Sequence, residues 1–149
     1  MKILDKAIDI AYEAHEGQMY GDYQYIRHIL QVVNSSRKLF RPKIDDDSLE
    51  IVALLHDSVE DCEEVTKDSL VSDGIPLKLV EAIILVTKKE GVSYKDYLKT
   101  LSRNELAWKV KVADTYCNLT ESIKGGDVKR VRKYSKQIEL LYKFKSWEE

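Results

Sequence analysis

Four ionisable residues follow an unbroken apolar stretch near the middle of the chain. The stretch is Ile51–Leu55, and it leads directly to His56, Asp57, Glu60 and Asp61. Because residues three and four apart share a helical face, a helix that continues this far would carry an imidazole and carboxylates along one ridge. Carboxylates are almost never buried without a partner, and the ridge contains no Lys or Arg. The pattern therefore indicates a cation from elsewhere, with a divalent metal as the first candidate.

The ridge alone leaves a second interpretation open. Glu60 and Asp61 could lie at a solvated helix end, while His56 is hydrogen-bonded and Asp57 caps a neighbouring group. Adjacent residues on one helix cannot surround an ion, so a metal site would need ligands from other helices. The choice between the two interpretations depends on the rest of the chain.

Two further residues complete a candidate ligand set. His28 is one of only three histidines and lies early in an expected helix, and Asp114 lies far downstream among apolar residues. Two nitrogen and two carboxylate ligands suit Mn, Fe, Zn or Ni better than Ca. The candidate ligands of a single divalent ion are His28, His56, Asp57 and Asp114.

Helix-period spacing of apolar residues runs through most of the chain, which predicts an all-α fold of six to eight helices. Ser93 and Asn104 are expected helix caps, and no convincing strand pair is found. The central helix, which follows caps at 45–48, should be buried nearly all round. The other expected helices cover 3–15, 25–40, 66–71, 76–86, 94–101, 105 to about 120, and 127–144.

Length and composition fit one globular domain spanning residues 1–149. Hydrophobic residues make up 44% and charged residues 34%, with six Gly and two Pro, so the chain is neither disordered nor β-rich. No apolar run is long enough for a membrane span. Cys62 and Cys117 are the only cysteines and no signal peptide is evident, which favours a reduced, cytoplasmic setting.

The segment from 124 to 145 is locally basic, with eight Lys or Arg against two acidic residues. A solvated helix face is the ordinary interpretation. The segment could also help to hold an anionic ligand. Nucleic-acid contact is a weaker hypothesis, since the net charge is only −2, and it would predict a steep salt dependence.

Several short motifs, in order, resemble the HD-domain metal-dependent phosphohydrolases, and more closely the hydrolase domain of the RelA/SpoT family. The resemblance extends from the first helix to about residue 120 and implies a helical HD-type bundle. It also implies removal of the 3′-pyrophosphate of guanosine tetra- and pentaphosphate, with one Mn²⁺ as cofactor and a nucleotide as the small-molecule partner. The motifs are AHEGQ at 14–18, YIRH at 25–28, ALLHDSVED at 53–61, VTK at 86–88, and KVAD at 111–114 followed by Asn118 and Leu119.

The resemblance assigns roles by position. The ligand set named above resembles the family's metal ligands. Glu60 and Asp61 resemble an acidic pair beside the metal-bound water, where a carboxylate orients or deprotonates the nucleophile. Asn118 resembles a substrate-contacting residue, and Lys88 and Lys111 are candidate phosphate contacts.

Some of these residues also have ordinary structural interpretations. Asn118 could cap a helix end, and Lys88 and Lys111 could form solvent-facing ion pairs. His15 matches a family position but is expected to fix the turn from helix to loop rather than to bind metal.

The chain also departs from the family. Alarmone hydrolases usually carry basic residues after the Gln of the first motif, where Met19 and Tyr20 stand here. Ile29 stands where the family has a Pro after its first His. The usual basic residues around the later Asp are replaced by Thr115, Cys117 and Thr120. The metal machinery is thus complete while the nucleotide contacts differ.

Three functions remain open on the sequence. The leading hypothesis is (p)ppGpp 3′-pyrophosphate hydrolysis. The second is hydrolysis of another nucleotide phosphate, such as a nucleoside monophosphate, by the same fold. The third is a metal-containing module that binds a nucleotide without turnover, although such a module has no need of Glu60 and Asp61. The base, the phosphate position, the native metal, the oligomeric state and the role of Met19 and Tyr20 are left undetermined.

Overall fold

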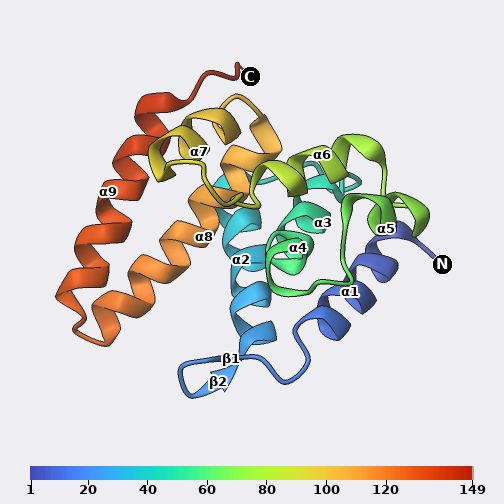
Figure 1. Ribbon diagram of the computed structural model, residues 1–149, viewed down its shortest axis with the longest axis horizontal. Helices are drawn as coiled ribbons and strands as arrows, with labels where there is room; N and C mark the ends of the chain where they lie inside the picture. Colours follow the sequence, from blue (N-terminus) through green and yellow to red (C-terminus); the bar gives the residue numbers. More distant parts are fainter. Residues whose placement is uncertain (149) are drawn as a thin grey trace.

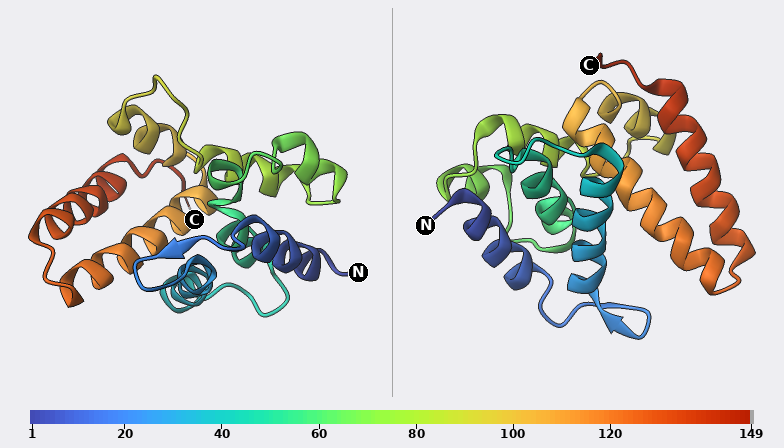
Figure 2. Two further views of the ribbon diagram at one scale, coloured as in Figure 1. Left: turned by 60° about the horizontal axis from the view of Figure 1, so that its bottom comes forward. Right: turned by 180° about the vertical axis from the view of Figure 1, so that it is seen from behind.

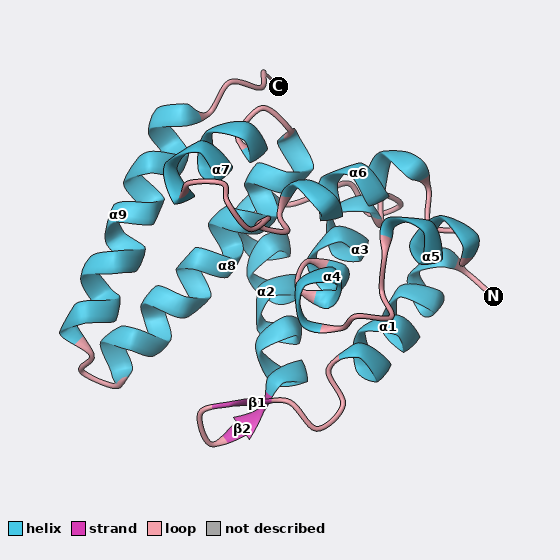
Figure 3. Cartoon of the chain, in the orientation of Figure 1, coloured by secondary structure: helices cyan, strands magenta, loops and turns pink. Residues whose placement is uncertain are grey.

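Helices dominate the computed structural model, which describes residues 1–148 (Figure 1, Figure 3). Eight helices of six or more residues and one of four residues are found in this range, which confirms the predicted all-α class. They are α1 (Ile3–Ala14), α2 (Tyr25–Phe40), α3 (Ser48–Leu55), α4 (Ser58–Asp61), α5 (Lys67–Ser72), α6 (Leu77–Leu85), α7 (Tyr94–Leu101), α8 (Glu105–Lys124) and α9 (Val128–Phe144). No described helix combines the length and the mean hydropathy needed to cross a membrane.

The central helix lies inside the bundle. In Figures 1 and 2, α2 lies between α3 and α8, and α8 pairs along its length with α9. Helices α1 and α6 also pack against α3. Residues 51–55 of α3 are all buried, as the apolar run predicts. Removal of this apolar surface from water is the main force that holds α3 in place.

Predicted caps begin two of the helices. The Ser93 side chain accepts a hydrogen bond from the Asp96 N–H at 3.1 Å, and the Asn104 side chain accepts one from the Ala107 N–H at 2.9 Å. Helix α8 continues beyond the predicted end at Thr120. The Thr120 hydroxyl donates to the Tyr116 carbonyl one turn back, a common arrangement for a threonine within a helix.

A two-stranded hairpin precedes α2, so the expectation of no strand pair was wrong. Strand β1 (Met19–Tyr20) pairs antiparallel with β2 (Tyr23–Gln24), and Gly21 adopts φ 58° in the turn between them. A left-handed conformation of this kind favours glycine. Strands of two residues are too short to produce a recognisable period-2 pattern.

The predicted ridge helix is interrupted after Leu55, and α4 begins only at Ser58. The Ser58 hydroxyl donates to the Leu55 carbonyl at 2.7 Å, and His56 Nδ1 donates to the Ala53 carbonyl at 2.6 Å. In a continuous helix these carbonyls would accept backbone N–H groups four residues later. Side-chain donors therefore compete with the helix at this point.

Candidate metal centre

The four predicted ligand residues converge from different parts of the fold. His28 lies on α2, His56 and Asp57 lie at the break between α3 and α4, and Asp114 lies on α8. One ligand atom from each residue lies within 4.8 Å of those from the others. The structure thus brings together residues as many as 86 positions apart.

The helix break lets neighbours in the sequence face one point. His56 Nε2 lies 3.0 Å from Asp57 Oδ2 and 3.6 Å from Asp114 Oδ1. On a continuous helix, successive side chains would point about 100° apart. His56 and Asp57, at the break between α3 and α4, nevertheless bring their side chains together.

Within the cluster, interactions between charged groups shift the pKa values of His56 and Asp114 more than burial does. Burial favours the neutral form of each group, but Asp57 and Asp114 together raise the pKa of His56 well above its ordinary value. Burial would likewise raise the pKa of Asp114, yet Lys111, His28 and His56 hold it well below its usual range. Despite its burial, the pKa of Asp57 is also lowered by His56, so both carboxylates are ionised and lie against the imidazoles.

The cluster fits a divalent metal. His56 Nδ1 is committed to the Ala53 carbonyl, and the buried Nε2 faces two carboxylates without a hydrogen bond of good geometry within residues 1–148. A metal-binding histidine is typically held in this way, with its second nitrogen bonded to a carbonyl. The two aspartates also bring negative charge that a divalent ion would neutralise. The donor set suits Mn, Fe, Zn or Ni.

Tyr25 is a neighbour of the cluster that the sequence analysis missed. Its hydroxyl donates to Asp57 Oδ2 at 2.7 Å. Burial, together with the Asp57 charge, raises the pKa of Tyr25 far above its ordinary value, so the phenol stays a donor. Tyr25 stands three residues before His28, and that helical spacing is the signal that could have identified it.

Glu60 and Asp61 lie at the exposed rim of the cluster. Glu60 Oε1 accepts a hydrogen bond from the Lys88 backbone N–H at 3.0 Å, and Asp61 Oδ2 accepts one from Gln18 Nε2 at 3.0 Å. Partial burial raises the pKa of each carboxyl. His15 Nδ1 lies 2.7 Å from Gln18 Oε1, so His15 fixes the turn after α1, as predicted.

The three candidate substrate contacts are placed differently from one another. Asn118 lies within α8 and donates to Asp114 Oδ1 at 3.2 Å, so it is not a helix-end cap. Lys111 is not solvent-facing, because its side chain is 14% exposed and Nζ lies 3.4 Å from Asp114 Oδ2. Lys88 reaches the rim through its backbone N–H to Glu60.

The basic helix α9 contributes a residue to the same region. Arg130 Nη2 donates to the Tyr20 hydroxyl at 2.9 Å, and that hydroxyl donates to Asn118 Oδ1 at 2.8 Å. The basic composition of 124–145 indicated a possible anion contact but did not single out Arg130. Met19, next to Tyr20 on β1, is 55% exposed and lines a separate hollow together with Gln24.

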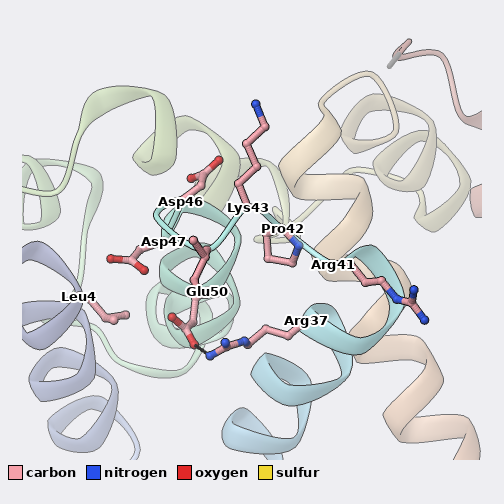
Figure 4. A pocket seen from close by; sticks show the side chains of 9 residues that line it. Leu4, Arg37, Arg41, Pro42, Lys43, Asp46, Asp47 and Glu50 are labelled. Atoms are coloured by element: carbon pink, nitrogen blue, oxygen red, sulfur yellow. Dashed lines mark hydrogen bonds and ion pairs between the residues drawn. The ribbon is translucent and has the colours of Figure 1, made fainter.

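A hollow of about 410 Å³ lies elsewhere, among α1, α2 and the segment before α3 (Figure 4). Arg37 and Glu50 form an ion pair of 2.8 Å in its wall, and Arg41, Asp46 and further charged residues surround it. The opposing charges largely compensate one another. None of the candidate metal ligands lines this hollow.

The fold and the cluster define a class: an all-α, HD-type bundle around a candidate centre of two histidines and two aspartates. No protein-family model and no curated protein matches the chain. A solved structure that does match is that of a metazoan ortholog of SpoT, which hydrolyzes ppGpp and plays a role in starvation responses. The match has a TM-score of 0.76 and 18% sequence identity, and it covers 95% of this chain and 86% of that one. This likeness confirms the fold that the RelA/SpoT resemblance implied.

Proposed function

We propose that this protein, as one domain spanning 1–149, is a metal-dependent phosphohydrolase of a nucleotide. Removal of the 3′-pyrophosphate of guanosine tetra- or pentaphosphate is the leading case, with one Mn²⁺ as cofactor. The observation that carries the proposal is the convergence of His28, His56, Asp57 and Asp114 beside a carboxylate rim. The fold shared with a protein that hydrolyzes ppGpp supports the same conclusion.

A divalent ion held by the four ligands would stabilise the charge of a phosphoryl group and lower the pKa of water. Glu60, at the rim, accepts the proton of the attacking water. Burial raises the pKa of Glu60, which makes it a stronger base than an ordinary glutamate. Asp61, held by Gln18, adds negative charge beside Glu60 and orients the water.

Positive and polar groups also lie close to the cluster. Asn118 and Lys111 contact Asp114 directly. Arg130 is linked to Asp114 through Tyr20 and Asn118. Together with Lys88 they hold the phosphates of a small nucleotide. The proposal includes a cytoplasmic setting, in line with the free thiols of the two cysteines.

A different nucleotide phosphate is the second candidate, and one observation favours it. Tyr20 stands where alarmone hydrolases carry basic residues, and its hydroxyl is already hydrogen-bonded to Asn118 and Arg130. A site with fewer cations there would suit a substrate with fewer phosphates. A binding module without turnover is disfavoured by Glu60, which such a module would not use.

The test is hydrolysis of guanosine tetraphosphate by Mn-loaded protein, followed by separation of the nucleotide products. Asp57→Asn removes a ligand charge, and Asp9→Asn makes the same chemical change at an exposed position of α1. We expect pyrophosphate release by the wild type and by Asp9→Asn but not by Asp57→Asn. Activity in an Asp57→Asn protein that has lost its metal would contradict the proposal.

Two other outcomes select the alternatives. Turnover of another nucleotide, but not of guanosine tetraphosphate, by metal-replete wild type would support the second candidate. Tight nucleotide binding without turnover, unchanged by Glu60→Ala, would support the binding module.

A further inference from the structure

The two histidines of the cluster are held in different ways. His56 Nδ1 donates to the Ala53 carbonyl, which fixes the orientation of its ring. His28 Nε2 lies 2.9 Å from Asp114 Oδ1, but its Nδ1 is buried with no hydrogen-bond partner within residues 1–148. The second nitrogen of a metal-binding histidine usually makes the bond that sets the ring. Another contact must therefore orient His28.

The contact that covers His28 comes from the hairpin. The Tyr20 ring lies nearly parallel to the His28 ring, with centroids 4.9 Å apart and an interplanar angle of 21°. Tyr25 contacts the same imidazole at 5.3 Å but is tilted by 58°. A ring stacked face to face on His28 restricts rotation of the imidazole about its χ2 angle.

Tyr20 is itself fixed at both ends. Its ring stacks on that of Tyr23 across the hairpin, with centroids 5.3 Å apart. Its hydroxyl accepts from Arg130 and donates to Asn118 Oδ1, and Asn118 Nδ2 donates to Asp114 Oδ1. A chain of donors thus runs from a guanidinium on α9 to a ligand carboxylate on α8. Tyr20 contacts one ligand residue directly and a second one through Asn118.

We propose that Tyr20 is a positioning residue of the metal centre: its ring orients His28, and its hydroxyl orients Asn118 and, through it, Asp114. The hairpin then supports the metal ligands at the position where the family resemblance implied basic nucleotide contacts. The inference concerns metal affinity and does not depend on which phosphate ester is hydrolysed.

The experiment measures Mn²⁺ affinity by isothermal titration of metal-free protein without nucleotide. Tyr20→Ala removes ring and hydroxyl, while Tyr20→Phe removes the hydroxyl alone. Met19→Ala is the matched control, since this neighbour on β1 is exposed and lines a hollow that includes none of the candidate metal ligands. Changes around metal ligands typically weaken affinity by about 10–100-fold. We expect a loss of this size for Tyr20→Ala, a smaller loss for Tyr20→Phe and no change for Met19→Ala.

A second readout separates positioning from general damage to the hairpin. In NMR spectra of the metal-free protein, the His28 ring signals should broaden or shift in Tyr20→Ala and stay close to wild type in Tyr20→Phe. Unchanged Mn²⁺ affinity in both Tyr20 variants would overturn the proposal, as would equal losses in Tyr20→Phe and Tyr20→Ala. Mn²⁺ binding that depends on Tyr20 in a protein without nucleotide turnover would overturn the proposed function and leave this inference standing.

Discussion

Lys111 and Asp114 form a buried ion pair one turn apart on α8, and its disruption can be followed quantitatively. Their side chains are 14% and 7% exposed, and Nζ lies 3.4 Å from Oδ2. Asp114→Asn leaves the ammonium group without its carboxylate in a water-poor environment. Removal of one partner of a buried pair costs about 3–5 kcal/mol of unfolding free energy. We therefore expect a large loss of stability even without any metal.

The expected change is measurable by thermal unfolding. For a domain of this size, 1 kcal/mol shifts the melting temperature by about 2–4 °C, so Asp114→Asn should lower it by about 6–20 °C. The measurement is made at pH 7 with a chelator, so that loss of metal binding does not contribute. Lowering the pH should shrink the difference. The low pKa of Asp114 gives stability that is present above the ordinary Asp pKa and is lost as the pH falls through the folded-state value.

A second substitution separates the two roles of Asp114. Lys111→Met removes the unpaired charge, so the double variant should recover most of the lost melting temperature. It should not recover Mn²⁺ affinity, because the ligand is still missing. Additive losses in the double variant, or an unchanged melting temperature in Asp114→Asn, would refute this account of the pair.

Three further expectations follow from the same structure. Because burial raises the pKa of Glu60, a pH–rate series should show activity falling as the pH drops through a value above the ordinary Glu pKa. Glu60→Gln should remove most of the turnover at every pH of that series. Mn²⁺ at 100 times its dissociation constant should stabilise metal-free wild type by about 2.7 kcal/mol in thermal unfolding, and Asp57→Asn should abolish the effect. Trp108 is 2% exposed and its Nε1–H donates to the Leu141 carbonyl. Trp108→Ala should therefore lower the free energy of unfolding by about 3–5 kcal/mol in denaturant unfolding. A loss below about 1 kcal/mol would show that this contact between α8 and α9 is dispensable.

Local patterns in the sequence predicted most of the helices. The apolar period marks their faces, and Ser93 and Asn104 mark two of their starts, because these signals depend on hydrogen bonds and burial within a few residues. The same reasoning could not see the hairpin, whose strands are two residues long. It also allowed one helix to continue through residues 51–61. The Ser58 hydroxyl competes for the Leu55 carbonyl, and this competition cannot be recognised from the spacing of apolar residues.

The candidate site divides in a similar way. The sequence supplied the candidate ligand chemistry of His56, Asp57, His28 and Asp114, and the family resemblance assigned the same four residues to the metal. The tertiary structure alone decided that Lys111 pairs with Asp114 in the interior rather than facing solvent.

The structure also decided which distant residues meet at the centre. Tyr20 lies 98 positions from Asn118 and 110 positions from Arg130, and it contacts both. Contacts of this range depend on how the hairpin, α8 and α9 pack, which is set by the summed burial of many apolar side chains. No short segment of the chain encodes that packing. The sequence thus determined the helices and the candidate ligand chemistry, while only the assembled bundle determined the residues that surround and orient those ligands.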